Sequence, residues 1–223
     1  MSGKWDFVVD NRYNSEKERP LTAAEKQRLA DFEDYCEEME EKGWRITELT
    51  AGIKEANTKA LLVFLPFGLL FFILFFAKNS LESFRGSVWG FVLLIVAFLV
   101  FSVVHELLHG VTWGLFAENR FKDIEFGYIK EYFTPYCTCK APLKLVPYLV
   151  GALMPLVILG IVPCVISVFT GSFLLLIFGL CMIGGAGGDV LISLRLLKAR
   201  GKAAETLYLD HPTKAGSVMF EKD

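Results

Sequence analysis

Residues 88–110 read VWGFVLLIVAFLVFSVVHELLHG, and this stretch decides both the expected fold and the expected chemistry of the chain. Its first 17 residues carry no charge, and apolar residues resume after the motif as far as Phe116. A membrane-spanning helix over residues 88–116 is therefore predicted. The stretch contains H-E-x-x-H, in which His105 and His109 lie four residues apart and so project from one helical face.

Two imidazoles at this spacing can bind one zinc ion, and Glu106 beside them can act as an acid/base toward a water molecule. The chain has only three histidines, and the motif uses two of them. The alternative is that these are helix-surface or capping residues without a metal. The apolar setting favours the metal site, because ionisable side chains are costly there unless they have a function.

The composition agrees with a membrane protein. Hydrophobic residues make up 53% of the 223 residues, and the mean hydropathy is +0.44. The net charge of −2 gives no basic surface, so no nucleic-acid partner is expected. The five cysteines are odd in number and lack a disulfide-framework spacing, so reduced thiols are predicted; Cys137-x-Cys139 has no second pair that would make a structural zinc site.

The expected fold is an all-α membrane protein with four transmembrane helices. The first 20 residues are polar and contain no secretory signal peptide, so the first apolar span would direct insertion. Proline interrupts the first and third spans. The four predicted spans cover residues 60–77, 88–116, 145–170 and 173–194.

Residues 1–50 are interpreted as a small α+β cytosolic appendage, and residues 51–223 as the membrane domain. Thr22 and Glu25 form a capping box that predicts a helix over residues 23–41. Residues 5–9 and 44–49 have strand-like patterns. A polar tail follows the fourth span.

Lysine and arginine counts set the expected orientation. Residues 117–144 hold five of them and residues 195–202 hold four, whereas residues 78–87 hold two and the Gly171-Ser172 connection holds none. This asymmetry predicts a multi-pass protein of the cell membrane with both termini in the cytosol.

Asp189 is the one charge in the fourth span, and an unpaired carboxylate there is costly and by default functional. His105 lies ~26 Å along the second span and Asp189 ~24 Å along the fourth, at 1.5 Å per residue, so both are expected at one depth. The neighbouring glycines 184, 185, 187 and 188 are expected to let another helix approach closely. The alternative is that Asp189 pairs with Arg195 or caps a helix broken at the glycines.

Asp189 is thus predicted as the third zinc ligand beside His105 and His109. Four other residues are candidates for this ligand. His211 lies in the tail, the Cys137 and Cys139 pair would favour a closed structural site, and Glu118 is two and a half turns past His109 and points away.

Residues 117–144 contain a second pattern, in which Ile124, Phe126 and Tyr128 alternate with polar or small residues. This alternation favours a half-buried strand and a membrane-edge β-hairpin at residues 120–140. An edge strand beside a metal site could hold a substrate by backbone pairing. An ordinary amphipathic loop at the membrane surface is the alternative.

The chain resembles a bacterial zincin-type peptidase family, similar to site-2-type intramembrane zinc metalloproteases. The resemblance covers roughly residues 45–220 and rests on the residues 105–110 motif, residues 135–140, the helix from Pro155 to Pro163, Gly188-Asp189 and residues 210–212. It implies zinc bound by His105, His109 and Asp189, with Glu106 as the catalytic acid/base. Gly-Gly-Asp-Val departs from the Asn/Leu-Asp-Gly type of motif that site-2 proteases usually have around the third ligand.

The sequence therefore predicts a membrane-embedded zinc-dependent peptidase whose substrate is a membrane protein or peptide. A non-catalytic metal-binding scaffold or sensor in the membrane is the alternative. A small transporter with a His/Asp relay is a second alternative, although no internal repeat of the kind that transporters show is evident.

Overall fold

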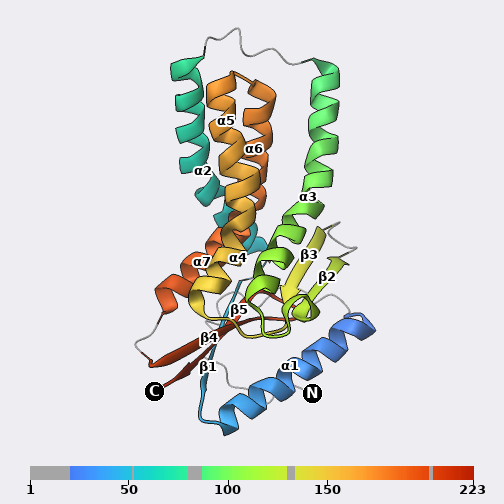
Figure 1. The fold of residues 1–223 in the computed structure, drawn as a ribbon, viewed down its shortest axis with the longest axis vertical. Coiled ribbons are helices and arrows are strands. Elements are labelled where there is room, and N and C mark those ends of the chain that lie inside the picture. Colours follow the sequence, from blue (N-terminus) through green and yellow to red (C-terminus); the bar gives the residue numbers. More distant parts are fainter. Residues whose placement is uncertain (1–20, 52, 80–86, 130–133, 201–202) are drawn as a thin grey trace.

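The computed structural model describes residues 21–51, 53–79, 87–129, 134–200 and 203–223. The strand expected at residues 5–9 lies outside these ranges. A bundle of long helices forms one end of the molecule, and a helix with two small antiparallel sheets forms the other end (Figure 1). The chain is mostly helical, as predicted, but its described residues also form five strands.

Helix α1 (Ala23–Glu41) begins and ends as the sequence predicts. The Thr22 hydroxyl accepts from the Glu25 amide, and the Glu25 carboxylate accepts from the Thr22 amide, which completes the capping box. The helix buries Phe32, Cys36 and Met39 in a core with residues of the C-terminal tail. These side chains share one face because they are three or four residues apart.

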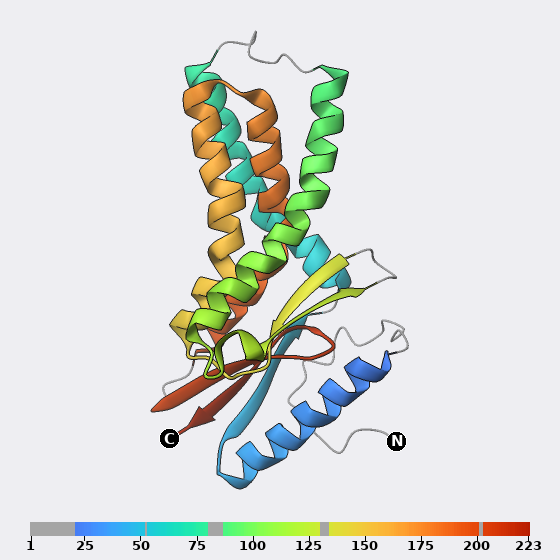
Figure 2. The same ribbon diagram turned by 45° about the vertical axis from the view of Figure 1, so that its right-hand side comes forward.

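The tail, expected only to be polar, forms two strands, β4 (Glu205–Asp210) and β5 (Ala215–Lys222). Strand β1 (Arg45–Ala51) pairs antiparallel with β5, so the strand order is β1-β5-β4. Helix α1 packs on this sheet (Figure 2). The boundary at residue 50 stays a prediction, and the sheet contains strands from both sides of it.

The apolar segments form helices close to the predicted spans. The first two are α2 (Ile53–Lys78) and α3 (Val88–Phe116). The 145–170 segment consists of α4 (Leu145–Pro155), the π-helical turn η5 (Leu156–Ile161) and α5 (Val162–Thr170). The last is a pair of helices, α6 (Phe173–Gly185) and α7 (Gly187–Ala199). Within the described residues, α3 and the 145–170 segment are long and apolar enough to cross a membrane, and α6 with α7 make a third such segment if the bent pair is one span. The apolar part of α2, Leu62–Lys78, is shorter.

Proline and glycine explain how the 145–170 segment packs. Pro163 has no N–H for the carbonyl four residues earlier, and the π-helical turn lies directly before it. A Cβ at Gly160 would lie 2.6 Å from Ile183, and one at Gly179 would lie 2.6 Å from Cys164, so α6 approaches closely at these glycines.

The expectation of close approach is wrong for Gly184, Gly185 and Gly188. An added Cβ would meet nothing within 4 Å at Gly185 and Gly188, and only Phe64 at 3.8 Å at Gly184. This glycine-rich run instead contains the 46° bend between α6 and α7. Glycine suits a bend because it lowers the stability of a continuous helix.

The hairpin predicted at residues 120–140 is confirmed. The 3₁₀ turn η3 (Arg120–Asp123) leads into β2 (Ile124–Ile129), which pairs antiparallel with β3 (Thr134–Cys139). A Cβ at Gly110 would overlap the Phe126 ring, and one at Gly114 would lie 2.5 Å from Phe121. The hairpin therefore packs on the half of α3 that follows His109.

A buried cluster connects the helical end to the sheets. It contains residues of α3, α4, α7, β3, β4, β5 and the chain between β3 and α4: Trp113, Ala117, Cys139, Ala141, Leu143, Tyr148, Ala152, Leu196, Tyr208 and Met219. In contrast, the first half of α3 is open on its outer side, with Trp89 80% exposed and Leu93 67% exposed. Such an apolar exterior suits a lipid environment better than water.

Candidate metal centre

Two ligand candidates come from one face of α3. His105 and His109 are both buried, and their rings are 4.8 Å apart between centroids. The two Nε2 atoms are separated by 3.1 Å. The helical spacing alone brings the rings together, as the sequence predicts.

Asp189 supplies the third atom from the first turn of α7. Its Oδ2 lies 3.1 Å from Nε2 of His105 and 3.6 Å from Nε2 of His109. The expected common depth of His105 and Asp189 is therefore confirmed, although they are 84 residues apart in sequence. Arg195, the alternative partner of Asp189, donates to the Thr50 carbonyl.

The three atoms form a triangle that fits a zinc ion. Zinc–ligand distances of 2.0–2.1 Å in a tetrahedron place the ligand atoms about 3.3 Å from one another. The observed edges of 3.1, 3.1 and 3.6 Å lie around this value. Two imidazoles and one carboxylate are also a donor set typical of catalytic zinc, with a fourth position for water or substrate. Among the described residues, these three form the one group that could hold a metal ion.

The outer partner of His109 fixes its orientation. Nδ1 lies 2.9 Å from the Gly151 carbonyl oxygen. A carbonyl can only accept, so Nδ1 carries the proton and donates; in the neutral ring, Nε2 then presents a lone pair toward Asp189 and His105. Metal-binding histidines ordinarily have such a second hydrogen bond.

Trp113 also helps to hold the His109 ring in place. Its indole stacks on His109 with rings 5.0 Å apart and 15° between planes, and its Nε1 donates to the Tyr148 carbonyl at 3.0 Å. A Cβ at Gly151 would overlap the indole, so only glycine fits at this position of α4. Helix α4 thus holds both the imidazole and the ring stacked on it.

Glu106 lies at the edge of the group, half buried. Its carboxylate is near enough to His105, His109 and Asp189 to interact with them electrostatically. The backbone amide of Cys137 on β3 lies near this carboxylate. Glu106 is therefore between the three ligand candidates and the edge of the hairpin.

The alternative ligands do not join the group. His211 lies in the turn between β4 and β5, where its Nδ1 accepts from the amides of Thr213 and Lys214. Burial raises the pKa of the Cys137 thiol, and it raises that of Cys139 to about 12, so both thiols are protonated. Glu118 is exposed.

Sequence reasoning missed the supporting residues. Asp210 accepts from the Cys139 amide at 2.8 Å and from the Tyr148 hydroxyl, so it joins β3 to α4. Burial raises the pKa of Asp210 above its ordinary value. The only signal in the sequence was the position of Asp210 beside His211 and Pro212, and it did not indicate these partners.

Comparison with known proteins adds one finding. Residues 98–204 match the sequence model of a protein family described as "Putative zincin peptidase". The matched range contains His105, Glu106, His109, the hairpin and Asp189. No curated protein and no solved structure matches the chain.

Proposed function

We propose that this chain is a membrane-embedded, zinc-dependent peptidase of the site-2 type, which hydrolyses peptide bonds in a membrane-associated or transmembrane protein. The observation that carries the proposal is the triangle of His105, His109 and Asp189 with Glu106 beside it. The family match and the long apolar helices support the reaction class and the location.

In this proposal His105, His109 and Asp189 bind zinc, and Glu106 is the acid/base. Bound zinc would polarise the scissile carbonyl and make a water molecule more acidic. The Glu106 carboxylate would accept a proton from the attacking water and return it to the leaving amine. The Gly151 carbonyl would keep His109 in the tautomer that the reaction needs.

Strand β3 offers a way to hold the substrate backbone. The Lys140 amide donates to the backbone carbonyl of Asp123, just before β2. Successive amides of a strand point to its two edges in turn, so the amides of Cys139 and Cys137 point away from β2. The sheet order is β2-β3, and no third strand pairs with β3 in the described part of the chain. Asp210 already accepts from the Cys139 amide, so an extended peptide would pair at Cys137, near the Glu106 carboxylate.

We further propose four spans with both termini in the cytosol. Helix α1 and both sheets lie at one end of the bundle, where the C-terminal part of α3 ends (Figure 1), which agrees with the lysine and arginine asymmetry. A cysteine introduced at Lys222 should resist a membrane-impermeant thiol reagent in intact cells, whereas one introduced at Ser83 should react. The opposite labelling pattern would overturn the orientation. Both variants are made with Cys181→Ser, because Cys181 is exposed.

The direct test combines zinc stoichiometry with hydrolysis of unfolded β-casein by the purified full-length protein. Glu106→Gln should retain zinc and lose hydrolysis, because the amide cannot accept the water proton. Glu118→Gln is the matched control and should behave as wild type. If Glu106→Gln hydrolyses casein at the wild-type rate, the mechanism is wrong. Wild-type protein that binds zinc without hydrolysis would favour a metal-binding scaffold or sensor.

Zinc stoichiometry also tests the ligand set. Asp189→Ala should lower zinc occupancy and hydrolysis together, because it removes one of three protein ligands. His211→Asn should leave the metal bound. If Asp189→Ala binds zinc as tightly as wild type, while a Cys137 and Cys139 double variant loses it, the ligand assignment fails.

A further inference from the structure

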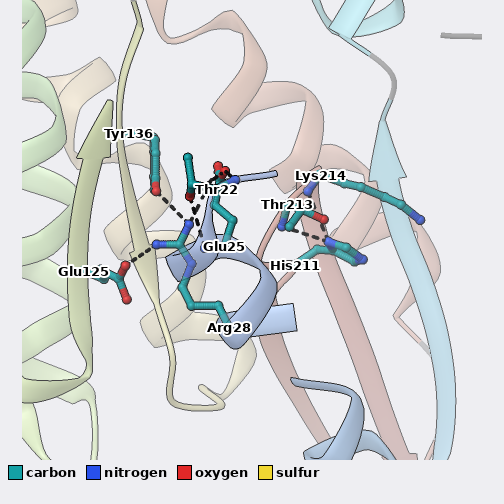
Figure 3. Close-up of polar contacts among 8 residues, drawn as sticks. All are labelled: Thr22, Glu25, Arg28, Glu125, Tyr136, His211, Thr213 and Lys214. Atoms are coloured by element: carbon teal, nitrogen blue, oxygen red, sulfur yellow. Dashed lines mark hydrogen bonds and ion pairs between the residues drawn. The ribbon is translucent and has the colours of Figure 1, made fainter. Parts of the chain in front are cut away.

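One side chain of α1 reaches the hairpin beside the metal centre. Arg28 donates through Nη1 to Glu125 on β2 and through Nη2 to the hydroxyl of Tyr136 on β3, the latter at 2.7 Å (Figure 3). The guanidinium also lies over the Tyr136 ring, 5.5 Å from its centroid. One planar group thus contacts both strands of the hairpin.

The hairpin side of this contact is shaped to receive it. Tyr136 is paired with Gly127 across the two strands. A Cβ at residue 127 would overlap the tyrosine ring, so the glycine lets the ring lie across β2. Lys140 also lies 3.9 Å from the Glu125 carboxylate, yet its side chain is half exposed, whereas that of Arg28 is 10% exposed. Arg28 is therefore the more buried of the two cations at Glu125.

The α1 side of the contact is firmly held. Glu25 is buried, closes the capping box with Thr22, and lies 3.9 Å from the Arg28 guanidinium. One turn later Phe32 enters the core that α1 shares with β4 and β5. The part of α1 that carries Arg28 is therefore fixed on the sheet.

The contact bears on the metal centre through the geometry of β3. The Cys137 amide points to the edge of β3 that faces away from β2, and it lies near the Glu106 carboxylate. The next outward amide, that of Cys139, is held by Asp210. The hairpin is thus fixed at its inner end by Asp210 and along its outer side by Arg28. Loss of the outer contact would let the part of β3 nearest Glu106 move.

We propose that Arg28 is a positioning residue, through which helix α1 sets the place of strand β3 beside Glu106. Arginine suits this task because its planar guanidinium can donate to two acceptors at once in a fixed geometry. The ammonium group of a lysine does not provide that geometry. The catalytic consequence rests on the proposed peptidase function, whereas the structural consequence does not. The N-terminal helix is in this view part of the site.

The structural part is tested by hydrogen–deuterium exchange of the full-length protein in detergent. Arg28→Ala should raise exchange in residues 124–129 and 134–139 by about 10-fold, because hydrogen bonds to a charged group are lost. Exchange in β4 and β5 should stay as in wild type. Arg28→Lys should give an intermediate value. Arg45→Ala is the control, since Arg45 is an exposed arginine that pairs with Glu221 on the other sheet.

Two exchange results would overturn the proposal. The first is wild-type hairpin exchange in Arg28→Ala. The second is an equal rise in α1, β4 and β5, which would mean that the substitution only unfolds α1. Neither result depends on peptidase activity.

The catalytic part is tested with β-casein as the probe. Arg28→Ala should raise KM more than it lowers kcat and should keep wild-type zinc stoichiometry, and Arg28→Lys should recover part of the loss. Wild-type kcat and KM in a variant with a loosened hairpin would refute a role in positioning. A loosened hairpin in a protein whose wild type hydrolyses no casein would leave the Arg28 assignment intact and count against the proposed function.

Discussion

Acidification to pH 5 should destabilise the sheet through His211. Its ring packs on Phe32 at 5.2 Å between centroids, and its Nδ1 accepts from the amides of Thr213 and Lys214 at 3.2 and 3.1 Å. Burial and the Lys214 charge lower the pKa of His211 to about 4, although Glu48 acts in the opposite direction. A proton on Nδ1 would face two N–H donors and end both hydrogen bonds.

The sign and size of the effect follow from linkage. The folded-state pKa is below the ordinary value of 6.5, so the unfolded state binds more protons between the two values, and stability falls as the pH falls through this window. The loss is about 2 kcal/mol at pH 5 and reaches about 3 kcal/mol below pH 4. The pKa of Glu48 is itself lowered below 4.5, so the Glu48 contribution is lost only at lower pH, and pH 5 separates the effect of His211 from that of Glu48.

His211→Asn provides the matched control. The Asn Oδ1 occupies the place of Nδ1 relative to the backbone and can accept the same two amides, but it does not titrate. Between pH 7 and pH 5, exchange protection of the buried Val218 and Phe220 amides, corrected for intrinsic rates, should fall roughly 25-fold in wild type. It should change little in the variant. Equal losses of protection in both proteins would refute the reasoning.

Further predictions concern the hairpin and its neighbours. Gly110→Val should push Phe126 away and destabilise the hairpin by about 1–3 kcal/mol, as overpacking does, which denaturant titration of the purified protein measures; a variant as stable as wild type would contradict the close approach. Asp210→Ala removes the acceptor of the Tyr148 hydroxyl and the Cys139 amide and should cost about 1–3 kcal/mol. Asp210→Asn should cost less, and equal losses in the two variants would contradict the hydrogen-bonding role.

The elements that the sequence predicted well are those with local signals. Helix α1 carries its capping box within its own first turn, and α3 is a continuous apolar run. His105 and His109 needed only the helical repeat. Asp189 was found by a different argument, the cost of a lone carboxylate among apolar residues, and its contact with His105 confirms the expected proximity.

The parts that were missed depend on pairing between distant segments. Strand β1 pairs with β5 across more than 160 residues, with Arg45 opposite Glu221, and no local pattern specifies that partner. The Gly151 carbonyl has no side chain to mark it, although it holds His109. Backbone groups that support a site are invisible to any reading of residue types.

The bend between α6 and α7 accounts for how Asp189 can be charged where it lies. The bend at Ala186 ends α6 and begins a new helix, and Asp189 falls in the first turn of α7. The unpaired amides of a helix N-terminus favour a negative charge. A straight helix through residues 173–199 would have placed the carboxylate in mid-helix without that support. The glycine run, the bend and the carboxylate therefore act together, and they direct the Asp189 oxygen to the two imidazoles of α3.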